Sequence, residues 1–101
     1  MKGQIVLFPQ RKLYVSNFSF DENHINGERH HRVTREDAER FIREADVEIT
    51  RWNGRFINYY GPNGAVFVDT QNNNIRTAFW SEEFDEHVQK MREVLKESGN
   101  D

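Results

Sequence analysis

The chain has 101 residues, of which 36% are hydrophobic and 13% aromatic, and it contains no cysteine. This length suits one domain, and no linker-like stretch divides it, so we expect a single domain over residues 1–101 without disulfides or thiolate metal sites. The formal net charge of −3 argues against strong non-specific attraction of the whole molecule to nucleic acid.

The first twenty residues contain two short runs with β-propensity, 5–8 and 13–18, on either side of Pro9. Such runs suit edge strands or an extended arm, because proline cannot donate a hydrogen bond inside a sheet. The apolar run 5–8 is much shorter than a signal sequence or a membrane span. We therefore expect no membrane association and a cytoplasmic location.

The segment 19–32 is polar and lacks a regular hydrophobic period, which predicts a loop. The segment contains histidine and arginine side chains. Imidazole can exchange a proton near neutral pH, and guanidinium can hold a phosphate through two hydrogen bonds, so the two groups together suit phosphodiester cleavage. On composition alone, a solvated loop without a chemical role is the commoner explanation. The side chains concerned are His24, Arg29, His30, His31 and Arg32.

A helix is predicted over residues 34–45. Thr34 and Asp37 have the spacing of a capping box, in which each side chain accepts from the other residue's backbone N–H. The apolar side chains recur at the helical spacing i, i+3, i+4, i+7, which indicates one buried stripe. They are Ala38, Phe41, Ile42 and Ala45.

Four strands separated by turn residues follow this helix. Asn53-Gly54 favours a type I′ hairpin turn, because both residues tolerate positive φ. The strands are expected at 47–52, 55–60, 65–69 and 75–80, with turns at 53–54, 61–64 and 71–74. The sequence thus predicts a four-stranded antiparallel meander.

A second helix is predicted over 82–96, with Ser81 as its N-cap. Its apolar residues recur at i, i+4, i+7 and i+11, so it should pack on the sheet or its edge, whereas the tail 97–101 should fray. The fold class is α+β, with one helix before the meander and one at the C-terminal end.

Antiparallel pairing across Asn53-Gly54 sorts the side chains of the first hairpin into two mixed faces. One face carries Val47, Ile49, Arg51, Phe56, Asn58 and Tyr60, and the other carries Glu48, Thr50, Trp52, Arg55, Ile57 and Tyr59. Two explanations stay open. One face is a groove lined by arginine, hydroxyl and aromatic side chains, or these are ordinary cross-strand contacts of surface residues.

The remaining motifs narrow the chemistry. Taken alone, Thr77 needs no explanation beyond its β-propensity. The histidines and nearby carboxylates have no spacing typical of zinc or calcium sites, so we expect no bound metal. No nucleophile elbow, P-loop or dinucleotide fingerprint occurs, and no other cofactor is expected.

From about His24 to Leu95 the chain resembles the phage- and toxin-associated nuclease domains grouped with barnase, EndoU, colicin E5/D and RelE. The resemblance is one of pattern, and it comes from a histidine-containing loop, a helix, a strand pair and a threonine-containing final strand. The segments that carry it are His24-Ile25, Arg29-His30-His31, Asn58-Tyr59-Tyr60-Gly61, Ala65-Val66-Phe67-Val68 and Ile75-Arg76-Thr77-Ala78-Phe79.

This resemblance implies a sheet with a helix on one face and a metal-independent, RNA-cleaving site on the other. It implies that His24 is a general base or acid, with His30 of the adjacent His30-His31 pair as a further candidate, and that Thr77 hydrogen-bonds the scissile phosphate. Negative charge would be stabilised by arginines, and Tyr60 would stack on a base or donate to phosphate. The arginine candidates are Arg29, Arg55 and Arg76.

Three functions are consistent with these observations. The first is a metal-independent endoribonuclease. For this function the resemblance implies RNA as the substrate and a cognate inhibitor (immunity) protein as a partner. The second is a non-enzymatic binding module of the immunity or adaptor type, whose acidic final helix faces a basic partner. The third is a stand-alone RNA-binding domain, which needs arginines and aromatic residues but not His24.

Overall fold

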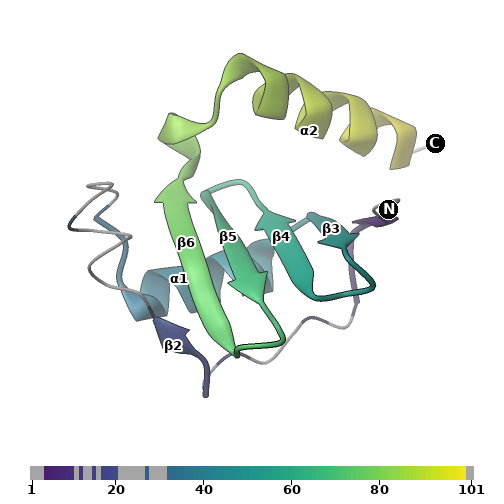
Figure 1. Cartoon of the computed structure of the whole chain (residues 1–101). Helices are drawn as coiled ribbons and strands as arrows, with labels where there is room; N and C mark the ends of the chain where they lie inside the picture. Colours follow the sequence, from purple (N-terminus) through teal and green to yellow (C-terminus); the bar gives the residue numbers. More distant parts are fainter. Residues whose placement is uncertain are drawn as a thin grey trace.

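The computed structural model describes residues 4–10, 12, 15, 17–20, 27 and 32–99. Within these ranges the chain is a small α+β domain with a six-stranded mixed sheet and two α-helices (Figure 1). The strand order across the sheet is β1-β3-β4-β5-β6-β2. The predicted fold class is therefore confirmed, but the sheet has two more strands than the four-stranded meander we expected.

The meander forms the centre of the sheet. Its strands are β3 (Val47–Arg51), β4 (Phe56–Tyr60), β5 (Gly64–Asp69) and β6 (Asn74–Trp80), each antiparallel to the next. Val47 pairs with Tyr60 and Arg51 with Phe56, so the register predicted for the first hairpin is correct.

Two short strands at the edges account for the difference. β1 (Gln4–Leu7) pairs antiparallel with β3, and β2 (Ser19–Phe20) pairs parallel with β6. The expected strand or arm at 13–18 is wrong where the structure describes it, because Phe18 N–H donates to the Val15 carbonyl in a turn. Both of these side chains are buried, so packing has replaced strand pairing there.

Helix α1 (Arg35–Glu44) begins as the sequence predicts. The Asp37 N–H donates to the Thr34 hydroxyl over 3.0 Å, and the Thr34 N–H donates to the Asp37 carboxylate over 3.2 Å. The buried stripe of α1 packs on one face of the sheet, where the Phe41 and Trp80 rings meet edge to face 5.0 Å apart. This face is the larger core of the domain.

Helix α2 (Glu86–Gly99) lies on the opposite face, across the end of the sheet where β4 ends and β5 begins (Figure 1). Val88 and Met91 pack there with Phe84, which comes from the segment before the helix. The predicted cap at Ser81 is wrong: Ser81–Glu83 form a short 3-10 helix, and the Asp85 carboxylate accepts from the Val88 N–H over 2.8 Å. The helix also continues through Gly99, so most of the tail that we expected to fray is helical.

Candidate functional site

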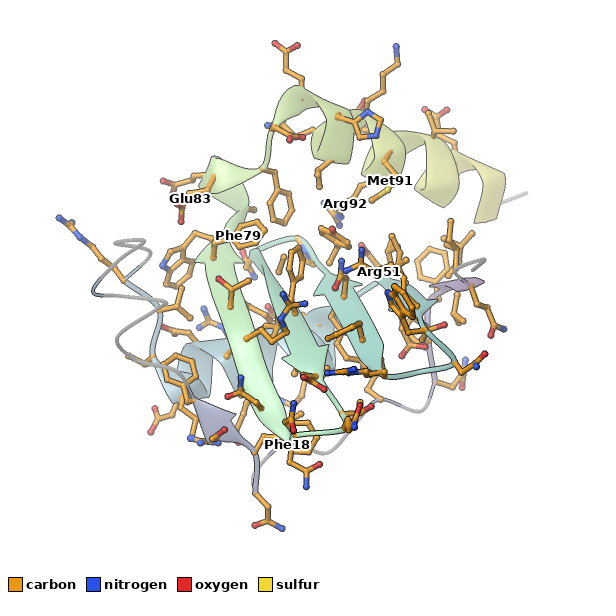
Figure 2. All side chains as sticks on the ribbon, viewed as in Figure 1. Phe18, Arg51, Phe79, Glu83, Met91 and Arg92 are labelled. Atoms are coloured by element: carbon orange, nitrogen blue, oxygen red, sulfur yellow. The ribbon has the colours of Figure 1, made fainter. Side chains whose placement is uncertain are left out.

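Helix α2 covers only one end of its sheet face, and the rest of that face is the candidate site. Figure 2 shows Met91 and Arg92 of α2 above the strands, with Arg51 projecting from the uncovered region below them. We call this region the open face. Its side chains are Arg51, Arg55, Phe56, Arg76 and Thr77, and the buried Asn58 lies on the same side of the sheet.

A β-bulge in β6 places Arg76 and Thr77 on the same side of the sheet. Thr77 pairs with Phe67 and Ile75 pairs with Val68, which leaves Arg76 as an extra residue between them. With regular alternation, Arg76 would point toward α1. The bulge shifts the alternation by one, so Ile75 enters the core under α1 while Arg76 and Thr77 both face outward.

Two arginines meet on the ring of Phe56. The Cζ atom of Arg55 lies 4.8 Å from the ring centroid and that of Arg76 lies 4.9 Å from it. The negative face of an aromatic ring attracts a guanidinium group, so the Phe56 ring helps to hold both arginine side chains in place. Both arginines are exposed, and guanidinium is a group that can bind an anion such as phosphate.

Arg55 reaches the open face because of the turn that precedes it. The hairpin loop has four residues, 52–55, rather than the two that we expected, and Trp52, Asn53 and Gly54 all have positive φ. Arg55 and Trp52 therefore lie outside the strand alternation that assigned them to the other face. The Arg55 Nε lies 3.6 Å from the Asp69 Oδ1 at the end of β5.

Asp69 is fixed mainly by the turn that follows it. Burial opposes its ionisation, but hydrogen bonds from the Asn72 side chain and from the Asn72 and Gln71 N–H groups, together with the charge of Arg55, lower the pKa of the carboxyl. The carboxylate is thus charged at neutral pH and turned toward this loop. It orients Arg55 and neutralises part of its charge.

Arg76 is a more available cation, because it forms no ion pair with any residue that the structure describes. Arg51 lies directly opposite Phe56 in the register, on the same face. Its charge reaches the far end of the open face, where it opposes part of the rise that burial causes in the pKa of Tyr60. The open face therefore carries three exposed guanidinium groups and one nearby carboxylate.

Tyr60 lies under α2 rather than on the open face. Its ring meets Phe67 and Phe84 edge to face at 5.7 and 6.0 Å, and the residue is 7% exposed. Burial raises the pKa of its hydroxyl, while hydrogen bonding with the Asn58 side chain and the charge of Arg51 act in the opposite direction. In this position Tyr60 supports the site from beneath α2, and its ring has little surface on which a base could stack.

Of the seven predicted site residues, the structure brings Arg55, Arg76 and Thr77 together. His24, Arg29 and His30 lie outside the described residues. The chain on either side of that segment is anchored along β6: Phe20 pairs beside Ile75, and the Trp80 Nε1 donates to the Arg32 carbonyl over 3.1 Å. The strand that carries Arg76 and Thr77 therefore also holds both ends of the histidine-bearing segment.

Sequence reasoning placed Arg51 and Phe56 on one face but did not include them among the site residues. The signal was present, since the predicted register puts an arginine opposite an aromatic residue. In contrast, no sequence signal marks the bulge at Arg76.

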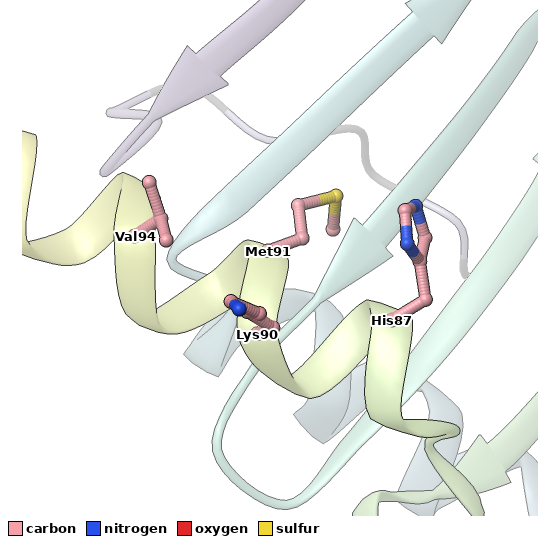
Figure 3. A pocket seen from close by; sticks show the side chains of 4 residues that line it. All are labelled: His87, Lys90, Met91 and Val94. Carbon is pink, nitrogen blue, oxygen red and sulfur yellow. The ribbon is translucent and has the colours of Figure 1, made fainter.

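A second surface lies along α2. A shallow hollow of about 290 Å³ is lined by His87, Lys90, Met91 and Val94, which share one stripe of the helix (Figure 3). The same helix and the segment before it also carry exposed acidic side chains: Glu82, Glu83, Asp85, Glu86, Glu93 and Glu97.

Among the described residues, no group of three or more histidine and carboxylate side chains could hold a metal ion. Likewise, no helix within the described ranges has the length and apolar character to cross a membrane. Comparison of the chain with protein-family models, curated proteins and solved structures finds no significant match.

Proposed function

We propose that this domain is a metal-independent endoribonuclease of a toxin or phage-associated protein, which cleaves RNA in the cytoplasm. The observation that carries the proposal is the bulge in β6, which presents Arg76 and Thr77 side by side on the open face, next to Arg55 on the Phe56 ring. These groups suit one scissile phosphate: guanidinium supplies positive charge and the hydroxyl supplies a hydrogen bond.

In the proposed reaction the 2′-oxygen attacks the adjacent phosphorus, and the bond from phosphorus to the 5′-oxygen breaks. A base accepts the 2′-hydroxyl proton and an acid donates a proton to the leaving 5′-oxygen. We assign His24 to one of these two roles. Arg55 and Arg76 stabilise the phosphorane, whose negative charge exceeds that of the starting phosphodiester.

The test is cleavage of a mixed-sequence RNA in EDTA, with detection of the 2′,3′-cyclic phosphate product. We expect His24→Ala to lower the rate at least about 100-fold, as is usual for a general base. Thr77→Val removes one hydrogen bond to a charged group and should lower it about 10-fold or more. Thr50→Val is the matched control, because Thr50 is a half-buried strand threonine on the opposite sheet face.

An inert wild-type protein would contradict the proposal and favour a second function. The exposed carboxylates on the helix that carries the hollow suit a binding module of the immunity or adaptor type with a basic protein partner. In that case Glu86→Lys and Glu93→Lys should weaken binding to that partner, whereas Arg76→Gln should not. A cognate inhibitor of the nuclease would be a natural partner for the same surface.

A further inference from the structure

Trp52 is the most exposed of the large hydrophobic residues in the described ranges. It is 59% exposed, in the turn that joins β3 to β4, directly between Arg51 and the rest of the loop that ends at Arg55. Exposed tryptophan is uncommon on a soluble domain, because its large apolar surface gains free energy when it is buried. Its position therefore needs an explanation.

The backbone of Trp52 makes the residue type more unusual still. Its φ is 55°, in the left-handed region that favours glycine and asparagine, and the following Asn53 and Gly54 share that conformation. A bulky residue is strained there, so the turn itself gives no reason for a tryptophan. Backbone strain of this kind clusters at functional sites.

The surroundings indicate what that function is. The Arg55 N–H donates to the Trp52 carbonyl over 3.2 Å, so the indole and the Arg55 guanidinium belong to the same tight turn. Arg55 in turn shares the Phe56 ring with Arg76. The exposed indole therefore comes from the same four-residue turn as one of the two arginines on the Phe56 ring.

We propose that Trp52 stacks on an unpaired base next to the phosphate bound by Arg55 and Arg76, so that the substrate of this site is single-stranded RNA. This inference rests on the proposed nuclease function. Exposed aromatic side chains beside a basic surface are the usual platform for single strands, since every base has a π-face. In a duplex the base faces are already stacked on one another and do not reach a flat surface side chain.

The probe is an unstructured 2′-O-methyl oligonucleotide, which cannot undergo 2′-hydroxyl attack, titrated against the protein by tryptophan fluorescence. The chain has two tryptophans. Trp80 packs against Phe41 and donates to the Arg32 carbonyl, so it reports little of an event at the turn. We expect the oligonucleotide to quench the emission of the wild type and not that of Trp52→Asn.

Trp52→Asn should weaken single-strand binding by between about 5-fold and about 150-fold, which is the range for losing one stacked base. Because asparagine tolerates positive φ, the melting temperature should stay the same or rise. Trp52→Phe keeps a smaller ring and should recover most of the affinity. A 2′-O-methyl duplex should bind both variants and the wild type within about 2-fold of one another, since it makes no stacking contact.

The outcomes separate this inference from the proposed function. If Trp52→Asn binds the single strand as tightly as the wild type while the wild type cleaves RNA, the stacking role is wrong and the nuclease proposal stands. If the variant loses affinity for the duplex equally, the preference for single strands is wrong. If the wild type neither binds the oligonucleotide nor cleaves RNA, both are wrong, and the exposed indole would instead suit a protein interface.

Discussion

Replacement of Arg76 by glutamine should change how RNA binding depends on salt. Each single-strand phosphate that a protein neutralises contributes about −0.7 to the slope of log K against log salt concentration. If Arg51, Arg55 and Arg76 each neutralise one phosphate, the slope of the wild type is about −2.1 and that of Arg76→Gln is about −1.4. Between about 50 and 200 mM salt, the wild type should then lose about 18-fold in affinity and the variant about 7-fold.

The assay is fluorescence anisotropy with a labelled 2′-O-methyl oligonucleotide across that salt range. Arg43→Gln is the matched control, because Arg43 is an exposed arginine on α1, on the other side of the sheet. It should weaken binding slightly through the total charge and leave the slope unchanged. A wild-type slope near zero, or an equal change of slope in both variants, would show that the open face does not bind phosphates through Arg76.

Two further predictions concern the framework of the site. Gly64→Ala places a Cβ atom 2.4 Å from the Phe41 ring, and Phe41 is only 1% exposed and cannot move freely. Thermal unfolding should therefore show that the free energy of unfolding falls by about 1–3 kcal/mol. Gly27→Ala is the control, because its Cβ would have nothing within 4 Å, and equal melting temperatures of the two variants would contradict the packing argument. The pKa of the Asp69 carboxyl is lowered in the folded protein, so its ionised form stabilises the fold above the unfolded pKa of about 3.9, and this contribution disappears as the pH falls through the folded pKa. Denaturant unfolding should therefore show that the stability difference between wild type and Asp69→Asn shrinks between about pH 6 and about pH 3, and a constant difference would refute this role.

The parts of the fold that were predicted from sequence are those fixed by local chemistry. The capping box at Thr34 and Asp37 specifies the start of α1, because both hydrogen bonds depend on residues three positions apart. The register of the first hairpin follows from Asn53-Gly54 even though the loop proved to be four residues long. The loop 52–55 is still centred on these two residues, so the strands on either side pair as predicted.

Of the two edge strands, β1 lies at the run 5–8 that was expected to suit an edge strand, whereas β2 was beyond sequence reasoning because a long-range contact creates it. β2 has only two residues, and what makes it a strand is pairing with β6, more than fifty positions later in the chain. The start of α2 was missed for a related reason. Phe84 is buried against Tyr60 and Phe79, so the chain stays extended there and the helix starts after Asp85 instead of at Ser81.

The candidate site was predictable in its residue types but not in its geometry. Arg76 and Thr77 were expected from the resemblance of the final strand to nuclease domains, but strict alternation would place them on opposite faces. Arg55 was assigned to the wrong face for the same reason, because a turn residue is free of the alternation that governs strands. Arg55 and Arg76 both contact Phe56, and such contacts have no local signature in the sequence.

The bulge in β6 also affects how this chain can be aligned with distant relatives. A protein with the same core but a regular β6 would need one residue fewer between Ile75 and Thr77, so a correct alignment contains a single-residue gap at Arg76. Without that gap, either the buried isoleucine or the threonine is matched to a residue with the opposite orientation. Profile searches that penalise gaps within strands would then score true relatives poorly at the very positions that define the open face.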